Sequence, residues 1–327
     1  SMTGLVSAIG LIIFIGYTAF RERISDMLEL PYYLVWGLII ISVLNASFEF
    51  WAATLRFQYK YKKLVLVTSL VIVLNPLLGL SMVLNSTSCK GEIRCLSIII
   101  VYLLVYGIVY IKNIAQGRQL FSEKEWKYVL IMAIPLLPHY LSQTLLNQCD
   151  RIMISHYQGK QYAAIYSVAY SLAILMMFVN KAINDSLTPW LYQKMKSKEI
   201  HGTKEVTNLL IISVGLLNIV LMIVAPEVMS VLASRDYYDA VYIIPPVAAS
   251  SFIIFVYGLF CNIEFYCEEQ VPMMITSVCG ALLNIILNWI FIPKMGYIAA
   301  GYTTLISYLF FLLLHYFIMK RAEKSLK

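Results

Sequence analysis

Ten apolar stretches, most of them near twenty residues long, run through the chain and are separated by short charged segments. A helix rises about 1.5 Å per residue, so about twenty apolar residues cross a hydrocarbon layer of about 30 Å. The pattern therefore predicts an all-α integral membrane protein with about ten transmembrane helices. The stretches are Gly4–Phe20, Leu34–Thr54, Leu64–Leu84, Ser97–Ile111, Val129–Cys149, Tyr162–Ile183, Thr207–Ala225, Val241–Asn262, Pro272–Phe291 and Gly301–Met319.

The composition agrees with this interpretation. Of the 327 residues, 60% are hydrophobic and 13% are charged. Soluble domains average about 45–50% apolar and about 25% charged residues. The net charge of +7 does not predict a nucleic-acid partner, because the cations lie in the loops between the apolar stretches.

The basic residues predict an orientation. Sixteen of the 25 lysines and arginines fall in one set of alternate loops and in the C-terminal tail, and eight fall in the opposite set. Loops rich in lysine and arginine stay in the cytoplasm. We therefore expect both ends of this chain to be cytoplasmic.

The loops also predict how the chain divides. Few connections exceed about 15 residues, which leaves no room for a soluble catalytic domain. The most polar connection is the basic segment Lys112–Lys127, which contains Gly117. We expect it to separate a bundle of four spans, residues 1–117, from a bundle of six spans, residues 118–327.

Polar side chains share one face in two of the predicted helices. Successive residues of a helix are rotated by about 100° around its axis. By this measure the polar side chains of the fifth span point within about 80° of one another, and those of the ninth span within about 40°. Polar groups are costly in lipid, so such a face either lines a hydrated cleft that binds substrate or forms hydrogen bonds between helices. The residues are His139, Gln143, Asn147 and Asp150 in the fifth span, and Ser277, Asn284 and Asn288 in the ninth.

Lys181 is a charge embedded in the sixth span, and Asp185 follows it by four residues. This spacing places the two side chains on one helix face, where they can neutralise each other. Alternatively, Lys181 offers a cation to an anionic head group. Both interpretations stay open on the sequence alone.

Three carboxylates near or inside the spans are candidates for coupling transport to H⁺ or Na⁺. They are Glu49, Asp150 and Glu264. Glu49 precedes Arg56 by seven residues and shares its helix face, so an ion pair between them is the alternative for this residue.

Signatures of catalysis are missing from the sequence. No histidine is followed five residues later by aspartate, and there is no phosphate-binding Gly-x4-Gly-Lys-Ser/Thr loop, Asp-x-Asp pair or Gly-x-Ser-x-Gly elbow. We therefore expect a protein that is not an enzyme and needs no cofactor. The six cysteines are not spaced for zinc, so no metal site is predicted. Cys89 and Cys95 share a predicted external loop. They either form a disulfide there or remain two free thiols.

Several short motifs follow one another along the chain. They include an Asn-x-x-Asp-Arg segment, a Tyr-Ser-x-Ala-Tyr helix opening, a Pro-Trp pair and a Leu-Asn-Ile-x-Leu-Asn run followed by Ile-Pro-x-x-Gly. These motifs lie in Leu145–Ile154, Tyr162–Tyr170, Thr188–Leu191 and Leu283–Tyr308, and a basic loop, Leu55–Lys60, precedes them. Together they resemble the motifs of bacterial polysaccharide flippases, a family of the multidrug/oligosaccharidyl-lipid/polysaccharide exporter superfamily.

The resemblance implies two bundles of six helices related by pseudo-symmetry, around a cleft that opens to either side in turn. The motifs place the present spans as helices three to twelve of twelve, so we expect the first two to be absent from this chain. The implied function is to flip undecaprenyl-pyrophosphate-linked oligosaccharide units, for O-antigen or capsule, across the bacterial cytoplasmic membrane. The implied partners are this lipid-linked oligosaccharide, membrane lipids and the polysaccharide polymerase machinery. Lys181 and the cleft residues would bind the substrate.

Three alternatives remain at this stage. A multidrug or cation antiporter of the same superfamily is expected to carry a carboxylate deep in its N-terminal bundle. A membrane polysaccharide polymerase or glycosyltransferase is expected to have a long external loop or a carboxylate pair. A shortened flippase that acts as a scaffold is distinguished only by an activity test.

Overall fold

The computed structural model of the chain describes residues 1–28, 30–86, 89–117, 119–199 and 202–325, and this part folds into helices without strands. Ten of the helices are long and apolar enough to cross a membrane, so the chain is a multi-pass membrane protein and the predicted all-α class is confirmed. They are α1 (Met2–Ala19), α3 (Tyr32–Phe57), α4 (Tyr61–Leu84), α5 (Lys90–Gln116), α6 (Glu123–Tyr157), α7 (Lys160–Lys196), α8 (Thr203–Leu232), α9 (Ile244–Tyr266), α10 (Gln270–Met295) and α11 (Tyr297–Ser325). Two short helices, α2 (Arg21–Leu28) and the 3₁₀ helix η1 (Arg235–Tyr242), lie between spans.

The chain divides into two compact units, Ser1–Leu130 and Ile131–Lys327. This division falls inside α6, later than the boundary expected between residues 117 and 118. The first turns of α6 belong to the N-terminal unit because Trp126 Nε1 donates to the Ser1 carbonyl oxygen at 3.2 Å and the Ser1 hydroxyl bonds to Glu125. Residue 118 itself lies outside the described residues.

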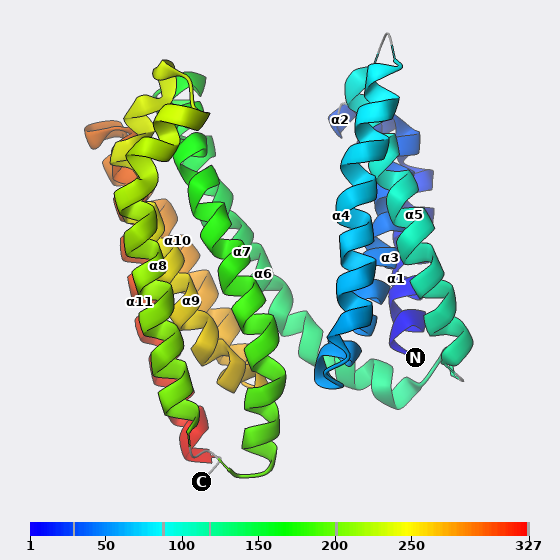
Figure 1. Cartoon of the computed structure of the whole chain (residues 1–327). Helices are drawn as coiled ribbons and strands as arrows, with labels where there is room; N and C mark the ends of the chain where they lie inside the picture. Colours follow the sequence, from blue (N-terminus) through cyan, green and yellow to red (C-terminus); the bar gives the residue numbers. More distant parts are fainter. Residues whose placement is uncertain (29, 87–88, 118, 200–201, 326–327) are drawn as a thin grey trace. The chain divides into compact units, whose positions relative to one another are not determined.

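The N-terminal unit packs α1, α3, α4 and α5 side by side (Figure 1). Its core is apolar and aromatic, with the rings of Phe48 on α3 and Tyr106 on α5 stacked at 4.1 Å between centroids. Asn113 on α5 donates to the Ser47 carbonyl oxygen on α3 at 3.0 Å. In this unit Cys89 and Cys95 are free thiols rather than a disulfide.

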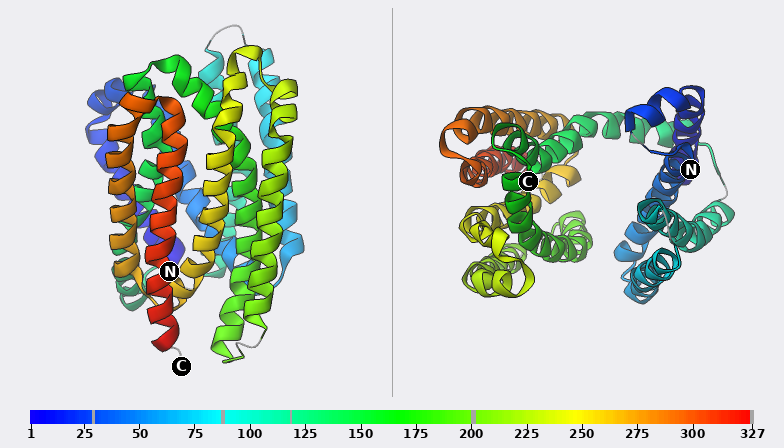
Figure 2. Two further views of the ribbon diagram at one scale, coloured as in Figure 1. Left: turned by 90° about the vertical axis from the view of Figure 1, so that its left-hand side faces the viewer. Right: turned by 90° about the horizontal axis from the view of Figure 1, so that it is seen from above.

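The C-terminal unit is a bundle of α6 to α11 in which α9 packs against α7, α8, α10 and α11. Figure 2 shows α10 and α11, in orange and red, running side by side in opposite directions. The largest core cluster draws side chains from all six helices, among them Ile154, Tyr166, Met229, Val247 and Ile292. Helices distant in sequence are thus brought together around α9.

Two tight connections in this unit depend on glycine. Gly159 joins α6 to α7 with φ of +102°, and Gly296 joins α10 to α11 with φ of +83°. Residues with a Cβ rarely adopt this backbone region, so glycine allows consecutive helices to reverse direction within one or two residues.

The outer surfaces of both units are apolar. Ile72 on α4 is 70% exposed, Leu141 on α6 63% and Phe317 on α11 65%. A soluble monomer rarely exposes so many large apolar side chains along one helix after another. These surfaces suit hydrocarbon rather than water, which agrees with the spans predicted from hydropathy.

Candidate functional site

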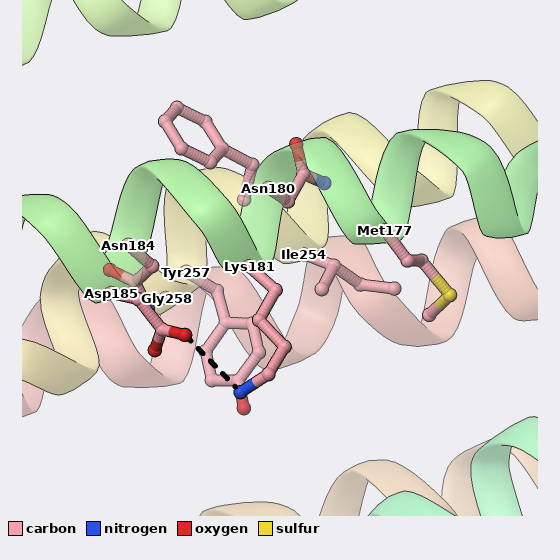
Figure 3. Close-up of a pocket in the computed structure, with 9 residues that line it drawn as sticks. Met177, Asn180, Lys181, Asn184, Asp185, Ile254, Tyr257 and Gly258 are labelled. Carbon is pink, nitrogen blue, oxygen red and sulfur yellow. Dashed lines mark ion pairs between the residues drawn. The ribbon is translucent and has the colours of Figure 1, made fainter. Parts of the chain in front are cut away.

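A concave pocket of about 310 Å³ lies between α7 and α9 in the C-terminal unit, and Lys181 is on its wall (Figure 3). Its lining mixes two charged residues, two asparagines and a tyrosine with apolar side chains. The lining residues are Met177, Asn180, Lys181, Asn184, Asp185, Ile254, Phe255, Tyr257 and Gly258. The pocket therefore offers a cation and amide groups beside apolar surface.

Lys181 forms the ion pair that its spacing predicts, with Nζ 3.6 Å from Asp185 Oδ2. The lysine side chain remains 67% exposed despite this pair. An ammonium group has three donors and an exposed ion pair contributes about 0.3–0.5 kcal/mol on a helix, so the pair leaves Lys181 able to bind a second anion.

Lys181 lies far from the end of α7, so its exposed charge indicates a polar environment at this position. It precedes Lys196, in the last turn of the helix, by 15 residues, or about 22 Å. A lysine facing hydrocarbon at the centre of a membrane costs about 3 kcal/mol, so such charges normally face protein or a watery cavity. The pocket supplies the polar surroundings that this position requires.

The asparagines of the pocket tie α7 to α9. Asn180 Nδ2 donates to the Ser251 carbonyl oxygen at 3.0 Å, and Asn262 Nδ2 donates to Asn184 Oδ1 at 2.6 Å. Sequence reasoning missed both α7 asparagines as site residues. Their signal was the spacing around Lys181, because positions 180, 181 and 184 lie on neighbouring parts of one helix face.

Gln143 is the predicted cleft residue that the structure brings to this pocket. It is half-buried, and its Nε2 donates to the Tyr257 hydroxyl oxygen at 3.2 Å. Tyr257 lies on α9 and thus connects Gln143 on α6 to the wall of the pocket that carries Lys181.

Asp150, Asn284 and Asn288 instead meet in a buried network where α6, α7, α10 and α11 pack together. The Asp150 carboxylate is fully buried and accepts hydrogen bonds from Tyr166 Oη at 2.5 Å, Thr304 Oγ1 at 2.7 Å and Asn288 Nδ2 at 2.7 Å. Asn288 Nδ2 also donates to Asn284 Oδ1 at 3.1 Å. In this structure these side chains hold helices together, and contact with substrate stays a prediction for them.

Asn147 and His139 continue the same polar face of α6 from Asp150 toward the N-terminal end of the helix. Asn147 Oδ1 accepts from Tyr170 Oη at 2.7 Å and from Tyr308 Oη at 3.2 Å. His139 is 3% exposed, with Nδ1 2.5 Å from Ser277 Oγ on α10. The polar faces were expected either to line a hydrated cleft or to form hydrogen bonds between helices. The contacts of Asn147 and His139 are hydrogen bonds between helices.

The two other candidate carboxylates belong to different units, Glu49 to the N-terminal unit and Glu264 to the C-terminal unit. Glu49 on α3 is paired with Arg56, with Oε2 and Nη1 3.7 Å apart, so the expected ion pair is confirmed. Glu264 on α9 is fully buried, with Oε2 2.7 Å from Nδ1 of His315 on α11. His315 was not identified from the sequence, because nothing local marks a histidine in an apolar span as the partner of a glutamate 51 residues earlier.

Comparison with known proteins gives the fold a family context. Residues 135–290, which include Asp150, Lys181 and Glu264, match the MatE family. An uncharacterized membrane protein of Haemophilus influenzae is 24% identical over 245 residues, covering 72% of this chain and 59% of that protein. The multidrug resistance protein NorM of Photobacterium profundum is 27% identical over 226 residues, covering 62% of this chain and 47% of NorM. The chain spans between 28% and 59% of the length of the curated relatives it matches.

Solved structures show the same fold across nearly the whole chain. An outward-facing multidrug resistance MATE transporter of the MOP superfamily superposes with a TM-score of 0.78 at 12% identity, covering 99% of this chain and 77% of the transporter. The lipid II flippase MurJ in an inward closed conformation superposes with a TM-score of 0.63 at 16% identity, covering 98% of this chain and 72% of MurJ. The chain thus has the fold of the MATE transporters and MurJ, and its central segment matches the MatE family.

Proposed function

We propose that this chain flips undecaprenyl-pyrophosphate-linked oligosaccharide across the cytoplasmic membrane of a bacterium, for O-antigen or capsule synthesis. The flippase motifs and the fold shared with a lipid II flippase support this substrate class. The matching proteins with a named role are transporters or a flippase, which supports a role that is not enzymatic. A polymerase or glycosyltransferase finds no support among them.

Lys181 is the observation that carries the proposal. It is an exposed cation inside a membrane span, on the wall of a pocket that also presents amide groups and the Tyr257 ring. Charge-assisted hydrogen bonds from lysine suit a pyrophosphate, while amides and aromatic surfaces suit sugars. Alternating access would present this site to each side of the membrane in turn.

Coupling to an H⁺ or Na⁺ gradient is part of the proposal. Asp150 and Glu264 are buried carboxylates at membrane depth, and such groups commonly serve ion coupling in transporters. Glu49 is the third candidate, although its pairing with Arg56 gives it a structural role as well. Membrane lipids and the polymerase machinery remain the proposed partners, with both ends of this chain in the cytoplasm.

Multidrug export is the second candidate function, and the similarity to NorM and to MATE structures favours it. The positive charge of Lys181 has opposite effects on the substrates of the two functions. An anionic pyrophosphate is attracted by the lysine, whereas a cationic drug is repelled by it. Neutralising Lys181 therefore separates the two functions in one experiment.

The test uses the full protein in the strain that encodes it, with Lys181→Gln, Lys181→Arg and the control Lys294→Gln. Lys294 is an exposed lysine near the end of α10, away from the pocket. A hydrogen bond to a charged group contributes about 1.5–3 kcal/mol, which corresponds to roughly tenfold to hundredfold in affinity. We expect Lys181→Gln to reduce surface polysaccharide by about that factor, while Lys181→Arg and Lys294→Gln keep it.

Drug susceptibility is measured on the same strains. Unchanged polysaccharide in Lys181→Gln, at equal amounts of inserted protein, overturns the substrate role of this lysine. If the same variant instead exports cationic dyes as well as or better than the wild type, the multidrug function is supported.

A further inference from the structure

A buried cluster of three metal-ligating side chains lies outside the Lys181 pocket. Cys261 and Glu264 are three residues apart on one face of α9, and His315 reaches them from α11. Their ligand atoms all lie within 4.8 Å of one another, and the three residues are buried. The cysteine spacing along the sequence gave no indication of this site, because its other two ligands are not cysteines.

One distance within the cluster already matches that of two ligands on a metal ion, and a second is shorter. Cys261 Sγ lies 3.7 Å from His315 Nδ1, and a tetrahedral zinc site with ordinary bond lengths separates sulfur and nitrogen by about 3.6 Å. Glu264 Oε2 lies 2.7 Å from the same nitrogen, at hydrogen-bond distance. An ion replacing the shared proton would require these two atoms to separate to about 3.4 Å, which a small rotation of the glutamate side chain provides.

One ligating group of the cluster has unused bonding capacity. Among the described residues, Glu264 Oε1 is buried without a hydrogen-bond partner and can serve as a second carboxylate ligand atom. His315 Nε2 is also buried without a partner, but it lies across the ring from Nδ1 and cannot bind the same ion. Buried polar atoms are nearly always bonded, and exceptions often mark a missing water or ion. The aromatic rings of Tyr257 and Phe311, with centroids 5.0 Å and 4.4 Å from that of His315, surround the imidazole with largely apolar material.

We propose that Cys261, Glu264 and His315 form a transition-metal site that takes Zn²⁺ and joins α9 to α11. Thiolate and imidazole ligands select zinc and similar ions, whereas Na⁺, Mg²⁺ and Ca²⁺ prefer sites made of oxygen. A bound Zn²⁺ would occupy the Glu264 carboxylate and so remove this residue from the candidates for H⁺ or Na⁺ coupling, which leaves Asp150 and Glu49. The site does not depend on the proposed transport substrate. Three protein ligands leave a fourth position for water.

The first test measures metal binding by the purified full chain in detergent. The protein is stripped with a chelator, incubated with Zn²⁺, and freed of unbound ion before zinc is counted by mass spectrometry. We expect one zinc ion per chain in the wild type and in the control Cys279→Ser, whose thiol is exposed. Cys261→Ser and His315→Gln should lose the ion. Equal zinc in Cys261→Ser and wild type would mean adventitious binding and overturn the site.

The second test does not depend on a ligand variant that fails to fold. Co²⁺ replaces Zn²⁺ in a chain in which Cys261 is the only remaining cysteine, and the absorption spectrum is recorded. A thiolate-to-cobalt charge-transfer band shows that Cys261 binds the ion directly. Absence of that band from chains whose melting curve matches the wild type overturns the proposal.

Discussion

The Asp150 carboxylate receives hydrogen bonds from three different helices, through Tyr166 on α7, Asn288 on α10 and Thr304 on α11. The carboxylate has no exposed surface. Each donor would lose its partner if the side chain were removed, and water cannot easily replace it. The contribution of this residue to stability is therefore larger than that of a single hydrogen bond.

We expect Asp150→Ala to lower the free energy of unfolding by at least about 3 kcal/mol, because each buried donor left unpaired costs about 1–3 kcal/mol. This corresponds to a melting temperature lower by roughly 5–10 °C, measured by thermal unfolding in detergent. Asp150→Asn keeps one carbonyl acceptor and should lose less. Asp236→Ala, at an exposed position on η1, is the control that should melt like the wild type. A wild-type melting curve for Asp150→Ala would contradict the network as a source of stability.

At the scale of single residues, the sequence identified the polar and charged side chains inside the spans. It predicted only some of the residues that they contact. Helical periodicity correctly placed Asp150 and Asn147 on one face of α6, and the spacing of Lys181 and Asp185 predicted their ion pair. The partners Tyr166 and Thr304 lie 16 and 154 residues after Asp150. Their roles depend on how helices pack, and no local pattern encodes that packing.

At the scale of helices, close approach between α10 and α11 requires a small residue. A Cβ atom added at Gly280 would lie 2.8 Å from Cδ2 of Phe311, whose ring is fully buried. The phenylalanine ring cannot swing away without displacing other core residues, among them Leu146 and Tyr308.

Gly280→Ala should therefore lower stability by about 1–3 kcal/mol through overpacking, although alanine favours helix more than glycine does. Gly107→Ala on α5, where an added Cβ meets nothing within 4 Å, should be neutral or stabilising by up to about 1 kcal/mol. Melting temperatures of the two variants in detergent test the contrast. Equal shifts for both would show that helix propensity, rather than packing, decides the effect.

The spans were the most predictable elements, because hydropathy over about twenty residues is a local property. Their ends were less so. The apolar stretch Tyr162–Ile183 marks only part of α7, which continues to Lys196, and Val129–Cys149 marks only the middle of α6. Backbone hydrogen bonds extend each helix into polar residues on either side of its apolar stretch. A prediction based on hydropathy does not include these residues in the helix. The short helices α2 and η1 lie in segments whose composition resembles loops.

At the scale of the whole molecule, the described residues contain ten candidate spans, and this even number predicts that both ends of the chain lie on one side of the membrane. The excess of basic residues predicts that this side is the cytoplasm. A fluorescent reporter fused after Lys198, in the α7–α8 connection, should be active in the cytoplasm. Alkaline phosphatase fused after Arg235, at the start of η1, should be active outside it. The reverse pattern would contradict the predicted cytoplasmic location of both ends.

The bonds of Asp150 also have a consequence for the order of synthesis. Thr304 lies 154 residues after Asp150, so at about 5–20 residues per second a ribosome makes it roughly 8–30 s later. Tyr166, only 16 residues downstream, is available almost at once. During this interval the Asp150 carboxylate lacks the hydrogen bond from Thr304. The packing of α11, the last span, thus completes the set of bonds that Asp150 has in the finished bundle.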